Sequence, residues 1–178
     1  MAKIGIFYGT DSGSTKKIAA LIHQTLGGDI AAQPVNINQV DETAFDQYDY
    51  LILGTPTYGE GELPGLSAEC ESESWEEFAP NFDDMDLSGK TVALFGLGDQ
   101  VNYADEFVDG LGELFDCVVD CGANVVGSWS TDGYEFNDST AVEEDKFVGL
   151  VIDKDNQSNL SEDRVATWVE QIKGEMSL

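Results

Sequence analysis

Basic residues are scarce in this sequence of 178 residues, which has 8 Lys and Arg against 35 Asp and Glu and a formal net charge of −27. No Lys or Arg lies between Lys17 and Lys90, or between Lys90 and Lys146. A chain with this charge is repelled by the phosphates of nucleic acids and by anionic membranes. The imbalance argues against both as partners and favours proteins with basic docking faces.

Histidine, cysteine and long apolar runs are also scarce. His23 is the single histidine, and no nucleophile or metal-ligand pattern accompanies it, so we expect no catalytic or metal-binding role for it. Cys70, Cys117 and Cys121 cannot all pair within one chain, which is typical of free thiols in a reducing cytosol. No signal peptide or membrane-spanning stretch is visible, so we expect a cytoplasmic protein.

Apolar segments expected to be strands alternate along the chain with segments of helical periodicity. The expected strands are residues 4–8, 30–37, 50–54, 91–96, 123–129 and 147–152. The expected helices carry apolar stripes at Ile18, Leu21, Ile22 and Leu26; at Phe107, Leu111, Leu114, Phe115 and Val118; and at Val165, Trp168, Val169 and Ile172, with Ser161 as the cap of the last helix.

The central expected strands are apolar without alternation, which indicates a parallel sheet covered by helices on both faces. Pro34 cannot donate a backbone hydrogen bond, so residues 30–37 are expected at an edge of the sheet. Polar residues at about 130–146 interrupt the last strand. The sequence therefore predicts one α/β domain over residues 1–178, with an excursion from the sheet at 130–146.

The turn at residues 9–15 is rich in hydroxyl groups and leads into the first expected helix. Free backbone N–H groups and the dipole of a helix favour a phosphate at this position. The turn lacks the Lys of a P-loop, the G-x-G-x-x-G of a dinucleotide-binding turn, and the Cys and Arg of a Cys-based phosphatase loop. A cradle for a terminal monophosphate and an ordinary helix start capped by Ser or Thr both fit this stretch. The candidate binding residues are Thr10, Asp11, Ser12, Gly13, Ser14 and Thr15.

Two further strand ends carry one tyrosine each among glycines and polar residues. In a parallel sheet, ligands bind beyond the carboxyl ends of the strands. Tyr58 and Tyr103 could sandwich a planar ring there, although tyrosines half-buried at loop edges are common. A phosphate at one end and a flat ring at the other describe a mononucleotide. The further candidate residues for cofactor binding are Thr55, Pro56, Thr57, Tyr58, Gly59, Gly61, Leu97, Gly98, Asp99 and Tyr103.

These loops, in this order, resemble those of the long-chain flavodoxins over essentially the whole chain. Residues 10–15 match the T/S-x-T/S-G-x-T phosphate signature of that family. Further similar motifs are found at residues 56–62, 98–103, 130–134, 147–150 and 155–157. Many relatives have Lys where this chain has Ser14, and Trp where it has Tyr58. Residues 59–65 and 73–78 are similar to those of flavodoxins that serve nitrogen fixation.

The resemblance implies non-covalently bound FMN and a flavodoxin-like, three-layer α/β fold. Its five-stranded parallel sheet would have the strand order 2-1-3-4-5 that is described for flavodoxin itself, with helices on both faces and the last strand interrupted by the insertion. The implied function is one-electron transfer, mainly between the FMN semiquinone and hydroquinone, rather than enzymatic catalysis. The Gly59 carbonyl would turn toward the flavin N5–H, a change that glycine makes easy. The implied partners are a reductase as electron donor and a reductase or nitrogenase-type protein as electron acceptor. The chain itself is expected to be a monomer.

Acidic residues near the expected ring indicate a low reduction potential. The second and third loops carry no cation, and each negative charge about 12 Å away opposes an added electron by roughly 0.7 kcal/mol at an effective dielectric near 40. For one electron this is about 30 mV per charge. We expect a docking rim around the ring made of Glu60, Glu62, Glu69, Asp99 and Asp105.

Two other functions are open to a chain of this fold. An FMN-dependent NAD(P)H:quinone reductase would need room over the ring and a basic group for the nucleotide phosphates. A phosphoacceptor signalling domain would need paired acids after the first strand and an Asp after the third. This chain has Gly9 and Thr10, then Thr55 and Pro56, at those places, so the signalling function is disfavoured.

Overall fold

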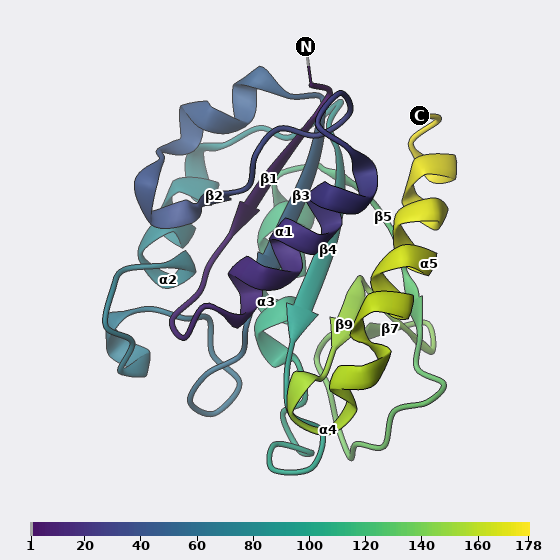
Figure 1. Ribbon diagram of the computed structural model, residues 1–178. Coiled ribbons are helices and arrows are strands. Elements are labelled where there is room, and N and C mark those ends of the chain that lie inside the picture. Colours follow the sequence, from purple (N-terminus) through teal and green to yellow (C-terminus); the bar gives the residue numbers. More distant parts are fainter. Residues whose placement is uncertain (1) are drawn as a thin grey trace.

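A parallel β-sheet forms the centre of the computed structural model, which describes residues 2–178. Its strand order is β2-β1-β3-β4-β5, and β9 also pairs with β4 (Figure 1). The predicted order 2-1-3-4-5 is therefore confirmed. The strands are β1 (Ile4–Tyr8), β2 (Val35–Asn36), β3 (Tyr50–Thr55), β4 (Thr91–Leu97), β5 (Asn124–Val126) and β9 (Leu150–Ile152).

Helices cover both faces of this sheet, as the uniformly apolar strands predicted. The helices α1 (Ser14–Leu26) and α5 (Ser161–Glu175) lie side by side on one face, where Ile22, Ile52 and Trp168 are fully buried (Figure 1). The other face is covered by α3 (Asp109–Asp120), α2 (Trp75–Phe78) and 3₁₀ turns, over a separate apolar cluster. The 3₁₀ segments are Ile37–Gln39, Glu42–Gln47, Leu66–Ala68, Ala79–Asp84 and Ser158–Leu160.

The expected second strand, residues 30–37, is mostly not a strand. Only Val35–Asn36 pairs with β1, and Ala31 adds an isolated bridge to Ile4. Pro34 lacks an N–H for the ladder, and the chain turns into a 3₁₀ helix from Ile37. Its position at the edge of the sheet is as predicted.

The fifth strand is divided into two short halves that pair with successive parts of β4. Residues 124–126 pair with residues 91–93, and residues 150–152 with residues 95–97. The expected strands at 123–129 and 147–152 were therefore too long. Gly127 ends the first half at a φ of 84°, and a Cβ at Gly149 would clash with the carbonyl of Leu94.

Between these halves the chain leaves the central sheet. It forms a three-stranded antiparallel sheet of β6 (Trp129–Ser130), β8 (Lys146–Phe147) and β7 (Val142–Glu143). The hydroxyl of Tyr134 donates a 2.6 Å hydrogen bond to the carbonyl of Val151, which fastens this excursion to β9. The segment outside the central sheet therefore extends beyond the predicted 130–146 at both ends.

The ends of two helices differ from the prediction. Phe107 precedes α3 and is fully buried, with its ring beside those of Tyr134, Phe136 and Phe147. Ser161 does not cap α5 but is its first residue, because α4 (Lys154–Gln157) and a 3₁₀ turn run directly into it. The capping side chain is that of Asp153, one segment earlier. Within residues 2–178, no helix is long and apolar enough to cross a membrane.

Candidate functional site

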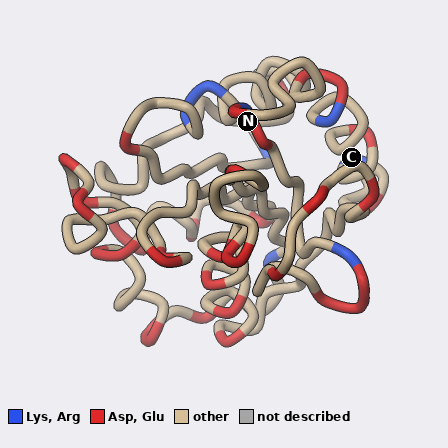
Figure 2. Tube along the Cα trace, turned by 90° about the horizontal axis from the view of Figure 1, so that it is seen from below, with Lys and Arg blue, Asp and Glu red and all other residues tan. Residues whose placement is uncertain are grey.

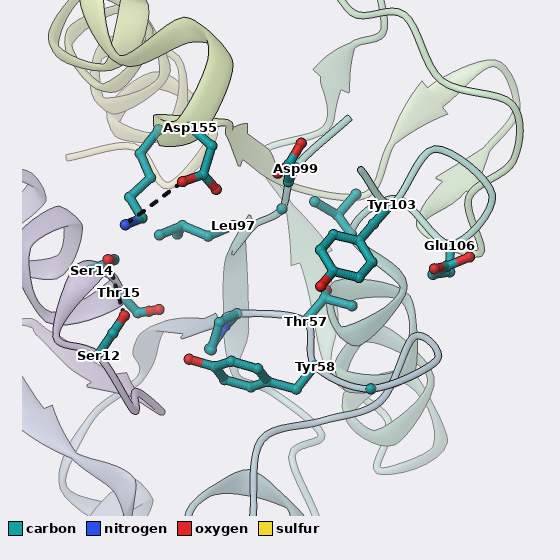
Figure 3. A pocket seen from close by; sticks show the side chains of 15 residues that line it. Ser12, Ser14, Thr15, Thr57, Tyr58, Leu97, Asp99, Tyr103, Glu106 and Asp155 are labelled. Carbon is teal, nitrogen blue, oxygen red and sulfur yellow. Dashed lines mark hydrogen bonds and ion pairs between the residues drawn. The ribbon is translucent and has the colours of Figure 1, made fainter. Parts of the chain in front are cut away.

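A cavity of about 260 Å³ opens at the carboxyl ends of β1, β3, β4 and β9 (Figure 3). This is the edge at which ligands bind in open parallel sheets. Most of the predicted site residues line it: Ser12, Ser14, Thr15, Pro56, Thr57, Tyr58, Gly59, Leu97, Gly98, Asp99 and Tyr103. Glu106, Val108, Lys154 and Asp155 line it as well and were not predicted.

The other predicted residues, Thr10, Asp11, Gly13, Thr55 and Gly61, are not part of this lining. The Thr10 hydroxyl accepts a 3.0 Å hydrogen bond from the backbone N–H of Gly13, within the first loop. The Asp11 carboxylate accepts from the N–H of Glu71 at 3.0 Å, which ties this loop to a distant segment. The side chains of Thr10 and Asp11 thus stabilise the conformation of the first loop and do not themselves line the cavity.

The N-terminus of α1 faces the cavity without a capping side chain. Gly13 occupies the cap position at a φ of 92°, a left-handed conformation that suits glycine, and no side chain accepts a hydrogen bond there. The Thr15 hydroxyl is also without a partner, although Thr15 is only 1% exposed. A buried hydroxyl without a partner is costly. The helix start capped by Ser or Thr is therefore not what the structure shows, and the unused donors fit an anion.

Two tyrosines reach the cavity from neighbouring loops (Figure 3). Tyr58 is half-buried, whereas Tyr103 is 51% exposed. Two backbone hydrogen bonds of 2.9 and 2.7 Å between Tyr58 and Glu62 close the second loop. Burial, and then the charge of Asp11, raise the pKa of Tyr58, so its hydroxyl stays neutral at physiological pH. Both rings line the same cavity, where a flat ligand could stack on them.

Asp99 is not a member of the expected docking rim. It is 8% exposed, and its carboxylate accepts hydrogen bonds from the N–H groups of Val101 and Asn102, both at 3.0 Å, and from the side chain of Asn156 at 2.8 Å. Burial opposes the charged form, but hydrogen bonds led by that of Asn102 outweigh it and lower the pKa of Asp99. The carboxylate therefore holds the third loop, which carries Tyr103, in shape.

Asp99→Asn should lower the free energy of unfolding of the FMN-free protein by about 1–2 kcal/mol at pH 7, because an amide replaces an acceptor of charge-assisted hydrogen bonds. A carboxyl group with a lowered folded pKa stabilises above its usual pKa, near 3.9, and that stability disappears as pH falls through the folded value. The difference between variant and wild type should thus shrink in acid. Urea unfolding of both proteins at pH 7 and at pH 3 measures this difference. Both pH values avoid the isoelectric point of about 4.1, where the protein is least soluble. An equal loss at both pH values would assign the effect to packing.

Two of the four residues that were missed, Lys154 and Asp155, follow the last strand of the sheet, and Glu106 and Val108 precede α3. Asp153 is fully buried and accepts hydrogen bonds from the N–H groups of Asp155 and Asn156 and from the side chain of Gln100 at 2.6 Å. It thereby fixes Lys154 and Asp155 beside the third loop. Because β9 ends at the same edge as β4, the rule used for the other strand ends would have found them had it been applied here.

Acidic residues are plentiful at the end of the molecule where the cavity lies. Figure 2 looks onto the end of the molecule that is lowest in Figure 1, and Asp and Glu are spread widely over it while Lys and Arg appear at few places. Glu60, Glu62, Glu69 and Asp105 are exposed on the loops near the cavity, and we call these four residues the acidic rim. The field at the opening is therefore negative.

Known proteins of one family are similar to this chain along its length. The flavodoxin family model matches residues 6–168. A flavodoxin of Klebsiella pneumoniae is 57% identical over 173 residues, covering 97% of this chain and 98% of that protein. One from Nostoc sp. is 45% identical, covering 99% and 98%. The crystal structure of Fusobacterium nucleatum flavodoxin bound to flavin mononucleotide superimposes with a TM-score of 0.87 at 36% identity, covering 98% of this chain and 99% of that one. With the fold, the cavity and these relatives in agreement, the chain belongs to the flavodoxin family.

Proposed function

We propose that this flavodoxin carries electrons one at a time on a single FMN bound non-covalently in the cavity. The observation that carries the proposal is the buried, unpartnered hydroxyl of Thr15 at the uncapped start of α1, in the same cavity as Tyr58 and Tyr103. One part of the site suits a phosphate and the other a planar ring. The FMN-bound relative from Fusobacterium nucleatum supports the same cofactor.

The phosphate would be held by neutral donors of the first loop. These are the first backbone N–H groups of α1 and the hydroxyls of Ser12, Ser14 and Thr15. The hydroxyls of Ser12 and Ser14 lie 3.3 Å apart, so both can reach one phosphate group. The ring would lie between Tyr58 and Tyr103, against Leu97 and the backbone of Gly98.

Bound FMN supplies the redox chemistry, and the chain sets how readily an electron is taken up. Gly59 has a φ of 55°, a left-handed conformation that glycine adopts at little cost. Glu60 and Glu62 lie on the same loop as Tyr58 and disfavour further negative charge on the ring. The protein would thus act as a low-potential carrier.

The partners of a flavodoxin are other redox proteins, and the acidic rim favours those with basic docking faces. We propose a reductase as the donor, and a reductase or a nitrogenase-type protein as the acceptor, with the chain acting as a monomer. The similarity of residues 59–65 and 73–78 to flavodoxins of nitrogen fixation supports the second acceptor. Membership of an electron-transfer family along nearly the whole chain does not favour the quinone reductase.

Purified protein should be yellow and should release one FMN per chain on acid treatment. Absorbance of the native protein and chromatography of the released flavin measure this. Protein that is purified without flavin should recover the same spectrum when FMN is added. A colourless protein that FMN does not reconstitute would contradict the proposed function.

A further inference from the structure

The residues proposed to hold the phosphate carry no positive charge. Lys154 lines the same cavity and carries one. It is the one basic residue that lines the cavity, over the part of the chain that the structure describes. It comes from α4, near the other end of the sequence, yet shares this cavity with Ser12, Ser14 and Thr15. Its ammonium group lies 3.9 Å from a carboxylate oxygen of Asp155, which also lines the cavity (Figure 3).

Within residues 2–178, the ammonium group of Lys154 makes one interaction, an ion pair with Asp155. Its contact with Asp155 is 3.9 Å long, and both side chains are 51% exposed. Exposed pairs of this kind contribute little. The backbone of Lys154 is fixed, by contrast, because the fully buried Asp153 before it caps α4. A free cation on a fixed backbone is suited to a ligand in the cavity.

A positive charge in the cavity would favour the binding of a phosphate there. The first loop offers hydroxyl and N–H groups and carries the carboxylate of Asp11, within a chain of net charge −27. A phosphomonoester at neutral pH has a charge between −1.5 and −2. Neutral donors satisfy its hydrogen bonds, but they do not offset the repulsion from the surrounding carboxylates.

We propose that Lys154, on α4, supplies a positive charge that helps the hydroxyl loop to bind the FMN phosphate. The proposal rests on the proposed function, since it assigns a residue to the same cofactor. The phosphate would then connect the start of α1 to the start of α4, which follow the first and last strands of the sheet.

Lys154→Met should weaken FMN binding about two- to fivefold at low salt, as expected for one partly exposed charge pair. Riboflavin lacks the phosphate, so its affinity should change less than twofold. Flavin fluorescence titrations of the FMN-free protein measure both constants. Lys146→Met is the matched control, because Lys146 is exposed on β8 and outside the cavity. It should leave both affinities unchanged.

A second lysine tests whether the charge itself matters. Ser14→Lys places a cation on the loop side of the same cavity. It should raise the FMN affinity of the Lys154→Met variant more than that of the wild type, since one cation already serves the phosphate there. FMN affinity of the wild type should also fall more steeply with salt than that of Lys154→Met.

The outcomes separate this inference from the function on which it rests. Equal losses for FMN and riboflavin, or no loss for either, would overturn the role of Lys154 while leaving FMN binding intact. If Lys154→Met binds neither flavin at all, the variant is misfolded, and Ser14→Lys in the wild-type background becomes the test. A gain in FMN affinity of more than about fivefold would then show that the wild-type cavity lacks a cation for the phosphate, which overturns the proposal. A gain of less than twofold supports it. A wild-type protein that binds no FMN would end the proposed function itself.

Discussion

Replacing Thr15 by Val is expected to weaken FMN binding and, at the same time, to stabilise the protein without FMN. Thr15 is 1% exposed, and its hydroxyl has no hydrogen-bond partner. Valine has nearly the same shape and removes the unsatisfied group, so the free energy of unfolding of the FMN-free protein should rise by up to about 1 kcal/mol. The same change removes a donor to the phosphate, which should cost about 1–3 kcal/mol of FMN binding. Urea unfolding and FMN titration measure the two effects.

Thr55→Val is the matched control for the stability effect. Thr55 is also fully buried, but its hydroxyl donates a 2.8 Å hydrogen bond to the carbonyl of Pro56. Valine at position 55 should therefore destabilise the FMN-free protein. Ser12→Ala, at an exposed position, should weaken FMN binding by about 1–3 kcal/mol with little effect on stability. If Thr15→Val destabilises as Thr55→Val does, or weakens riboflavin as much as FMN, the hydroxyl does not serve a phosphate.

The sequence predicted those parts of the fold and site that depend on local pattern. Uniformly apolar runs identified the central strands, because a strand with both faces covered has no polar side. The strand ends then brought residues of three separate loops to one edge, and the structure places most of them around one cavity. The strand order, by contrast, came from the family resemblance.

The parts that were missed depend only partly on contacts between distant segments. The fifth strand is short because of Gly127 and because Gly149 packs against the carbonyl of Leu94, which no local pattern reveals. The role of Asp99 was missed as well. Three of its four hydrogen bonds come from Val101 and Asn102 close by in the sequence, as in a turn closed by an Asp side chain, and only the bond from Asn156 depends on a distant segment. Lys154 shares the cavity with the first loop because β9 pairs with β4, and the strand-end rule would have found it had the rule been applied to the last strand.

Reversing two charges of the acidic rim should change both partner association and reduction potential. The double variant Glu60→Lys, Glu62→Lys alters four unit charges close to Tyr58. At about 30 mV for each charge, the potential of the second one-electron reduction should rise by up to about 120 mV at low salt. Association with a basic-faced reductase should slow about tenfold, because steering by opposite charges is lost. Redox titration and stopped-flow kinetics measure the two effects.

A matched reversal at the other end of the sheet separates local from overall charge. Asp29 and Asp49 are exposed near the amino ends of the strands, so Asp29→Lys, Asp49→Lys makes the same change in net charge far from the cavity. It should have much smaller effects on rate and potential. Both effects of the rim variant should diminish as salt rises, since exposed charges are screened over about 10 Å at 0.1 M. If the two double variants slow association equally, partners respond to net charge and the acidic rim is not their docking site.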